Sequence, residues 1–406
     1  MAVPGFSWRS TANGTVVQAD HTTNRKACSF SILSTVTVIF ILFSIGCVFI
    51  ATDNRMSLLG IQGEAYSVLI VNELFVGCPD PQIPLDTCRS RCPPRGSEAL
   101  PRDIVSRTSD LEMQLLSGSP KRKENSDTPK NLLAIPVGIK QKEGVDQIVQ
   151  KFLTADFRVI LFHYDGVVDE WRDLHWCDNA LHVSAINQTK WWFAKRFLHP
   201  DIVAEYNYIF LWDEDLGVEN FHPGRYLSIV QDEGLEISQP ALDTTRGLKV
   251  HYPITARQRR NKVHRRFYKL NGGSRCYGNS TGPPCTGWVE MMAPVFTRAA
   301  WRCVWHMIQN DLIHAWGLDY KLGYCAQGER SKTIGVVDAE YIVHKGIPTL
   351  GGFDLYKVPS GTSSGNEDRI NVRLRSAAEL EIFKERWRNA VDEDECWTDP
   401  YPEKIK

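Results

Sequence analysis

The sequence lacks the short motifs that most readily identify an enzyme class. It contains no G-x-G-x-x-G dinucleotide loop, no G-x-x-x-x-G-K-[ST] phosphate loop, no G-x-S-x-G nucleophile elbow and no H-E-x-x-H zinc helix. Oxidoreductases, P-loop ATPases, serine hydrolases and metalloproteases that carry these motifs are therefore not indicated. Any catalytic function must be argued from other residues.

The sequence also lacks an excess of either charge. Its 47 Lys and Arg residues balance 48 Asp and Glu residues, for a formal net charge of −1 over 406 residues. Domains that bind nucleic acid usually show a strongly basic surface, so we expect no nucleic-acid partner. With 43% hydrophobic residues, the chain has the composition of a globular protein.

One long uncharged segment, residues 27–52, exceeds the roughly 20 apolar residues that span a bilayer. The alternative is a cleaved signal peptide, whose apolar region would be about 7 to 15 residues long. Three cations, Arg9, Arg25 and Lys26, precede the segment against one acid. The positive-inside rule then predicts a single-pass type II membrane protein with residues 1–26 in the cytosol. The rest of the chain would be lumenal or extracellular.

The cysteines fit this orientation, because nine of the eleven follow the predicted span. An oxidising compartment favours disulfides. We expect Cys276 and Cys285, which bracket a loop rich in Gly, Asn and Pro, to pair. Cys88 and Cys92 remain alternative zinc ligands, although the sequence has no paired C-x-x-C motif.

Residues 53–129 contain eight of the 21 prolines together with charged runs, which predicts a flexible stem. From residue 130 strand-like and helix-like runs alternate. Strands are expected at 131–138, 157–165, 206–212, 288–296 and 334–344, and helices at 145–153, 190–198, 224–231 and 298–314. This order predicts an α/β domain over 130–359 with a mostly parallel sheet and helices on both faces. A linker and docking helix would follow in 360–406, with Leu380, Phe383, Trp387 and Val391 on one helix face.

In open α/β sheets, ligands bind at the carboxyl ends of strands. The apolar run YNYIFLW leads directly into Asp213, Glu214 and Asp215. Three adjacent carboxylates repel one another, and a divalent cation that bridges some of them would relieve the repulsion. Such a cation completes its shell with water and phosphate oxygens. The simpler alternative is an acidic turn after the strand.

A strand that ends in Asp-x-Asp, behind an N-terminal anchor and a Pro-rich stem, resembles the Golgi type II glycosyltransferases with the GT-A fold, which is Rossmann-like. Residues 131–352 also resemble a plant domain-of-unknown-function family. The matching segments are LWDEDLG, GWVEMMAPVF, WGLDYKLG and VHKGIPTLGG. Some members of that family are labelled "lysine-ketoglutarate reductase trans-splicing related", a label that establishes no chemistry.

The GT-A resemblance implies a metal site for Mn²⁺ or Mg²⁺. Asp213 and Asp215 would lie beside the cation and the nucleotide, and His344 would complete the metal shell. Neutral imidazole is a suitable ligand for manganese. Alternatively, His344 is an ordinary histidine at a strand end.

The resemblance also implies three further roles. Asp165 would lie near the nucleoside, Lys345 would contact phosphate, and Asp319 would take the acceptor's proton in an inverting transfer. Asp165 could instead begin the Asp-Gly turn, and Asp319 could be a helix N-cap.

Together these features predict a Golgi-membrane glycosyltransferase that transfers a sugar from a nucleotide sugar to a glycan or other hydroxyl acceptor. Two alternatives stay open, a non-catalytic glycan-binding or scaffolding protein with the same fold and a membrane-anchored metal-dependent hydrolase. The basic run at 257–269 is either a solvated loop or an electropositive lip for phosphate or an anionic acceptor.

Overall fold

The computed structural model describes residues 94–105, 130–259, 261–271, 275–347 and 364–402. By its contacts the chain divides into two compact units, Met1–Phe75 and Val76–Lys406, and all of these ranges lie in the second. The predicted span at 27–52 lies outside the described residues. Within the described ranges, no helix has the length and apolar character that a bilayer crossing needs.

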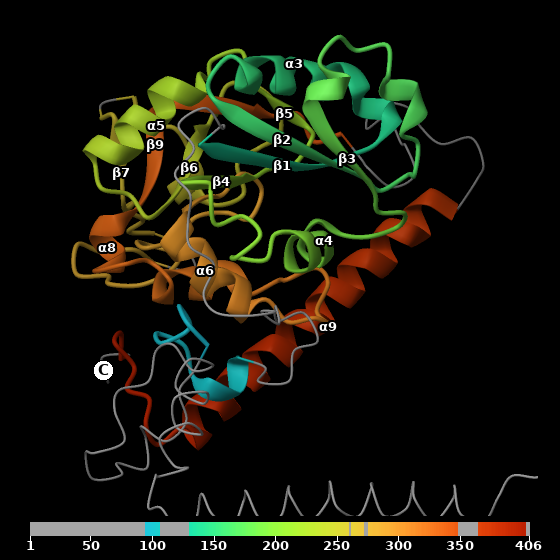
Figure 1. Cartoon of the computed structure of the whole chain (residues 1–406). Helices are drawn as coiled ribbons and strands as arrows, with labels where there is room; N and C mark the ends of the chain where they lie inside the picture. The colour runs from blue at the N-terminus through green and yellow to red at the C-terminus, as the bar shows by residue number, and fades with distance from the viewer. Residues whose placement is uncertain (1–93, 106–129, 260, 272–274, 348–363, 403–406) are drawn as a thin grey trace, which may run out of the picture. The chain divides into compact units, whose positions relative to one another are not determined.

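The first half of the α/β domain is the parallel part of the sheet (Figure 1). Its elements are β1 (Asn131–Val137), α3 (Lys142–Leu153), β2 (Phe157–His163), β3 (Ala180–Ser184), α4 (Lys190–Phe197) and β4 (Tyr208–Leu211). The spatial order of the strands is β3-β2-β1-β4, and every neighbouring pair is parallel. The carboxyl ends of these strands therefore lie at one edge of the sheet, as the sequence predicted.

The second half differs from the predicted parallel sheet. Its elements are β5 (Leu216–Gly217), α5 (Pro223–Asp232), β6 (Ile237–Leu242), β7 (Val263–His264), β8 (Val295–Thr297), α6 (Arg298–Met307), α7 (Leu318–Lys321), α8 (Arg330–Thr333), β9 (Ile334–His344) and α9 (Ser364–Glu393). β8 is antiparallel to both β4 and β6, and β9 is antiparallel to β5 and β7. Only β6 and β9 are parallel.

The expectation of a mostly parallel sheet is therefore wrong for this half. The chain passes from β6 to β8 through a long connection, whose described residues form the short β7 and a turn of 3-10 helix at Pro253–Thr255, and it returns in the opposite direction. A single helix crossover would have kept the strands parallel. Of the predicted strand at 288–296, only the last residues form a strand, which is β8. The predicted helix at 298–314 ends at Met307, because Ile308 is buried with an extended backbone.

Helices cover both faces of the sheet, as expected. Figure 1 shows α3 and α5 on one side and α4 and α6 on the other. The alternation along β1 explains this arrangement, because Leu133 and Ile135 pack in the core under α3 and α5, whereas Leu132 and Ala134 pack in the core with α4 and α6. α3 buries Val145, Ile148, Val149 and Phe152, which is the spacing of one helix face.

The C-terminal helix α9 packs on the α4 and α6 side of the domain. Phe383 and Trp387 are buried in that core, and Val391 packs against it. The sequence predicted this apolar face. Residues 94–105, which fall in the predicted stem, contribute Leu100, Ile104 and Val105 to the same core. This part of the segment is thus packed.

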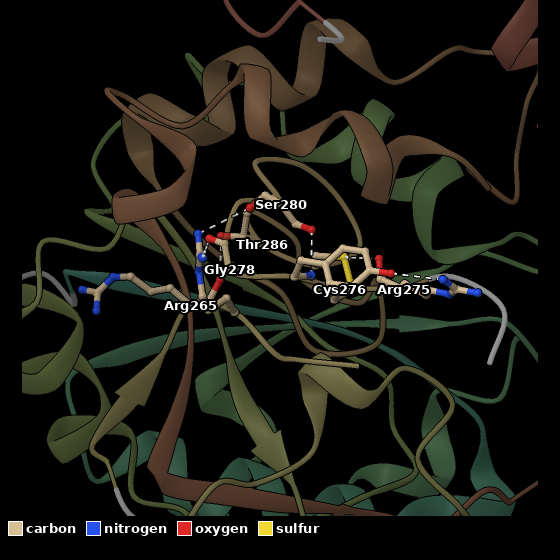
Figure 2. The surroundings of a disulfide bond; sticks show 9 residues. Arg265, Arg275, Cys276, Gly278, Ser280 and Thr286 are labelled. Carbon is tan, nitrogen blue, oxygen red and sulfur yellow. Dashed lines mark hydrogen bonds between the residues drawn. A yellow bond between two sulfur atoms is a disulfide. The ribbon is translucent and has the colours of Figure 1, made fainter. Parts of the chain in front are cut away.

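Two disulfides join cysteines that are both in the described part of the chain. Cys276 pairs with Cys285, as predicted, and Cys303 of α6 pairs with Cys325. Figure 2 shows the Cys276–Cys285 loop, where the Thr286 hydroxyl donates a hydrogen bond to the Arg265 carbonyl at 2.9 Å. Cys177 is a free, buried thiol.

Candidate functional site

The three consecutive carboxylates after β4 point to different partners. The exit of β4 lies beside the loop that precedes β8, where the Asp213 backbone N–H donates to the Met292 carbonyl at 2.9 Å. Glu214 is 3% exposed and turns into the protein, whereas Asp213 and Asp215 are half-buried. Successive side chains of an extended segment alternate between faces, which explains why the first and third carboxylates share a side.

Glu214 connects the carboxyl ends of β1 and β2. It accepts hydrogen bonds from the Gly138 backbone N–H at 2.8 Å, from Gln141 Nε2 at 2.9 Å and from the Tyr164 hydroxyl. Burial raises the pKa of Glu214 to about 8, although the bonds from Tyr164 and Gly138 oppose the shift. This central carboxylate therefore holds the loops together.

Asp213 forms an ion pair with Lys190 at the start of α4, with Lys190 Nζ 2.6 Å from its Oδ1. The same ammonium donates to the Met291 carbonyl at 2.6 Å. Burial raises the pKa of Asp213, and the Lys190 charge opposes this. Sequence analysis missed Lys190, because no local pattern in the sequence links it to a carboxylate 23 positions away.

Asp215 and His344 lie side by side, because β5 pairs with the end of β9 and Leu216 is opposite His344. His344 Nε2 is 3.2 Å from Asp215 Oδ2. Burial disfavours the charged imidazole, but the bond to Asp215 and the charges of Glu290 and Asp213 outweigh it and raise the pKa of His344. The structure thus joins two of the residues that the sequence analysis assigned to a metal.

This pair has the chemistry of a divalent-cation site. Mn²⁺ and Mg²⁺ accept carboxylate oxygen, and imidazole suits manganese. Within the described ranges, no group of three or more His, Cys, Asp or Glu side chains is arranged to hold a metal. Such an ion would draw its remaining ligands from substrate and water.

Two further carboxylates face the same region, Glu290 from the loop before β8 and Asp319 from α7. Burial raises the pKa of Glu290 to about 7, with Asp213 and Asp319 adding to the shift and His344 and Lys190 opposing it. Burial also raises the pKa of Asp319 to about 6, against nearby backbone N–H groups and the Trp288 indole. The N-cap of α7 is Gly317, so Asp319 is not the N-cap.

Asp165 and Lys345 follow the carboxyl ends of β2 and β9. Both Asp165 oxygens accept backbone hydrogen bonds, from Ile139 at 2.7 Å and Val167 at 3.0 Å, which matches the turn alternative. The Lys345 backbone N–H donates to the Asp215 carbonyl at 2.9 Å. The assigned ligand roles of both residues stay predictions.

The basic run does not form a free electropositive lip along its whole length. The Arg257 guanidinium lies 3.4 Å from the Tyr341 ring centroid. Arg265 binds the Glu233 carboxylate at 2.9 Å, and Arg266 Nη1 bonds to the Gly278 carbonyl. These arginines hold the irregular loops between β6 and β8.

A family model described as "Protein of unknown function (DUF707)" matches residues 91–393. The chain belongs to this family, which confirms the domain-of-unknown-function assignment made from the sequence. No curated protein matches the chain.

Several solved structures are similar to the chain, with low sequence identity and low TM-scores. TarS residues 1–349 from S. aureus has 11% identity and a TM-score of 0.34, with 53% of this chain and 60% of that chain covered. The same TarS segment in complex with UDP has 12% identity, a TM-score of 0.32, and 64% and 70% coverage. The glycosyltransferase GlyE from Streptococcus pneumoniae TIGR4 has 9% identity, a TM-score of 0.30, and 68% and 66% coverage. This chain thus spans about 60% of the length of the first of these.

Proposed function

We propose that this protein is a glycosyltransferase that uses a divalent cation, Mn²⁺ or Mg²⁺, to bind a nucleotide sugar. The observation that carries the proposal is the contact of Asp215 with His344 at 3.2 Å, at the strand ends that also carry Asp213 and beside Glu290 and Asp319. A cation held there would neutralise the diphosphate of the leaving nucleotide. Asp215 and His344 would hold it, with Asp213 beside the nucleotide.

Asp319 would take the acceptor's proton. With a pKa of about 6, its carboxylate is mostly ionised at neutral pH and is still basic enough to accept a proton. In an inverting transfer, the acceptor oxygen bonds to the anomeric carbon as its proton passes to Asp319. The bond from that carbon to the nucleotide diphosphate breaks, and the diphosphate leaves with the electron pair.

Lys190 would govern the position of Asp213. The Lys190 side chain is 9% exposed, and its ammonium is bound to Asp213 Oδ1 and to backbone carbonyls of the loop before β8. The Lys190 charge favours the ionised form of Asp213 against the effect of burial, and the ion pair fixes its orientation at the strand end. Lys345, after β9, would contact the phosphate, and Asp165, after β2, would contact the nucleoside.

The proposal includes the membrane topology expected from the sequence. A single helix at residues 27–52 would anchor the chain in the Golgi membrane, with the α/β domain in the lumen. Two disulfides in the described residues are compatible with an oxidising compartment.

A second candidate is a glycan-binding or scaffolding protein that performs no transfer. The ion pair of Asp213 with Lys190 favours this alternative, because it already satisfies one of the carboxylates assigned to the metal and nucleotide. The two candidates differ in whether a nucleotide binds together with a metal and turns over.

The test is thermal unfolding of the full-length protein in detergent, with UDP, GDP or CMP and with or without Mn²⁺. A ligand at about 100 times its Kd adds roughly 2.7 kcal/mol of stability, so binding raises the Tm measurably. We expect one nucleotide to raise the Tm only with the metal present, and Asp215→Asn to abolish this increase. Asp169→Asn, at an exposed side chain in a local ion pair, is the matched control. A folded sample whose Tm responds to no nucleotide would contradict the proposal.

A further inference from the structure

Beside the proposed metal site lies a group of five residues that we call the acid–aromatic cluster: Tyr252, Trp288, Glu290, Asp319 and Tyr320. Its members come from separate parts of the chain, namely the β6–β7 connection, the loop before β8, and α7. The Tyr252 and Trp288 ring centroids are 4.5 Å apart, and those of Trp288 and Tyr320 are 6.4 Å apart.

Two buried polar atoms of the cluster have no hydrogen-bond partner in the described part of the chain. They are the indole Nε1 of Trp288, a residue only 1% exposed, and Oε2 of Glu290. The indole N–H faces the Asp319 carboxylate and lowers its pKa as a donor, although the contact falls short of full hydrogen-bond geometry. A buried polar group that lacks a hydrogen-bond partner destabilises the fold. Two in one place require an explanation, and a ligand that pairs both would provide one.

The unpaired atoms define the chemistry of that ligand. The indole N–H can only donate a hydrogen bond, and an ionised carboxylate can only accept one. A hydroxyl group does both, so one hydroxyl can accept from Trp288 and donate to Glu290 or Asp319. An anion could not donate, and the nearby charges of Asp213 and Asp319 would repel it.

The aromatic side chains supply the remaining surface. Tyr320 is 41% exposed, and Tyr252 is half-buried beside Trp288. A partly exposed aromatic ring with a polar edge suits a ligand that has one apolar face and a rim of hydroxyls. A sugar ring has this character.

We propose that the acid–aromatic cluster is the acceptor subsite and that it selects an uncharged sugar, with Trp288 and Glu290 holding the reacting hydroxyl beside Asp319 and Tyr320 packing on the sugar face. This inference rests on the proposed function and deepens it by naming the acceptor class. Trp288 and Glu290 thereby become specificity residues that the sequence analysis did not single out.

The test measures binding of simple glycosides to the full-length protein in detergent, without nucleotide or metal. Methyl β-D-glucopyranoside, methyl β-D-galactopyranoside and methyl β-D-xylopyranoside are titrated by saturation-transfer NMR, and methyl β-D-glucuronide is the charged match. We expect at least one uncharged glycoside to bind, and the glucuronide to bind at least ten-fold more weakly than methyl β-D-glucopyranoside.

Three variants locate the binding. Glu290→Gln and Tyr320→Ala should each weaken binding on the order of ten-fold, because the first replaces a charged acceptor with a weaker neutral one and the second removes the aromatic ring. Tyr277→Ala, at a tyrosine of the same exposure outside the cluster, should leave the affinity unchanged. Unchanged Tm values for the variants separate loss of binding from loss of folding.

Three results would overturn the inference: no uncharged glycoside binds, the glucuronide binds as well as its uncharged match, or both cluster variants bind as the wild type does. None of these results depends on the nucleotide experiment. Glycoside binding without any nucleotide response would leave the acceptor subsite standing as a glycan-binding site and remove the transferase proposal. A nucleotide response without glycoside binding would leave the transferase proposal standing and remove the acceptor subsite.

Discussion

The residues after β4 show how closely spaced groups take separate roles. Asp213 pairs with Lys190, Asp215 with His344, and Glu214 with the backbone of Gly138. The period of two along an extended chain is visible in the sequence, so a shared side for Asp213 and Asp215 could be predicted. The identity of each partner could not, because all three partners lie far away along the chain.

A buried imidazole at the end of β2 gives a prediction at this scale. His163 is fully buried, and its Nε2 lies 2.8 Å from His182 Nδ1. Burial, together with the positive charge that His182 can carry, lowers the pKa of His163 from 6.5 to about 4. Between these pH values the unfolded chain binds a proton that the folded protein does not bind. The stability therefore falls as the pH falls from 6.5 to 4.

We expect His163→Phe to lose this pH dependence. The difference in stability between pH 7 and pH 4 should become smaller by about 3 kcal/mol, since each unit of pKa shift corresponds to about 1.4 kcal/mol. Urea unfolding of the full-length protein at both pH values measures it. Phe162→Leu, which also alters the buried part of β2 but removes no titratable group, should keep the full pH dependence. An equal dependence in His163→Phe and the wild type would contradict the prediction.

At the scale of elements, short strands and irregular loops build the site. β5 has only two residues, yet its antiparallel pairing with the end of β9 brings Asp215 to His344. The loop before β8 supplies both Glu290 and the carbonyls that bind Lys190. Such pairings leave little periodicity in the sequence, so the sequence analysis placed a continuous strand where most of this loop lies.

The disulfide between Cys303 and Cys325 gives a prediction for these elements. It joins α6 to the segment that follows α7, the helix that carries Asp319. Both cysteines are buried in the main core. Closing a loop of 22 residues should stabilise the fold by about 3 kcal/mol. We expect Cys303→Ala/Cys325→Ala to lose about this much in urea unfolding.

The second disulfide is the matched comparison. Cys276 and Cys285 close a loop of only nine residues and belong to a smaller core. Cys276→Ala/Cys285→Ala should therefore lose less stability than the first pair. An equal or larger loss for the second pair would show that loop length and core position do not set the order.

At the scale of the whole unit, residues 94–105 and the end of α9, which are distant in sequence, pack together on the α4 and α6 side of the sheet. Arg102 donates to Asp394 from its backbone N–H at 2.8 Å and from Nε at 2.8 Å. Asp394 has a 2% exposed side chain, and the Arg102 guanidinium holds its pKa below the usual range against the effect of burial. This ion pair ties residues 94–105 to the end of α9.

We expect Arg102→Ala to destabilise the protein by about 2 kcal/mol, because it leaves a buried carboxylate without its cation. Arg172→Ala, which breaks an ion pair between side chains that are 77% and 83% exposed, should leave the stability unchanged. Urea unfolding of the two full-length variants makes the comparison. Equal effects would mean that the contact between residues 94–105 and α9 adds nothing to the fold.

The sequence by itself determined the alternation of strands and helices, the covered faces of the sheet, the apolar face of α9 and the pairing of Cys276 with Cys285. These features follow from hydrophobic periodicity and short-range spacing, which a chain carries locally. It also placed Asp213, Asp215 and His344 at strand ends. Only the tertiary structure decided that Lys190 forms an ion pair with Asp213 and that β8 runs antiparallel to its neighbours. It also decided that Trp288 and Glu290 keep unpaired polar atoms beside Asp319. These depend on contacts between distant segments, which no local pattern records.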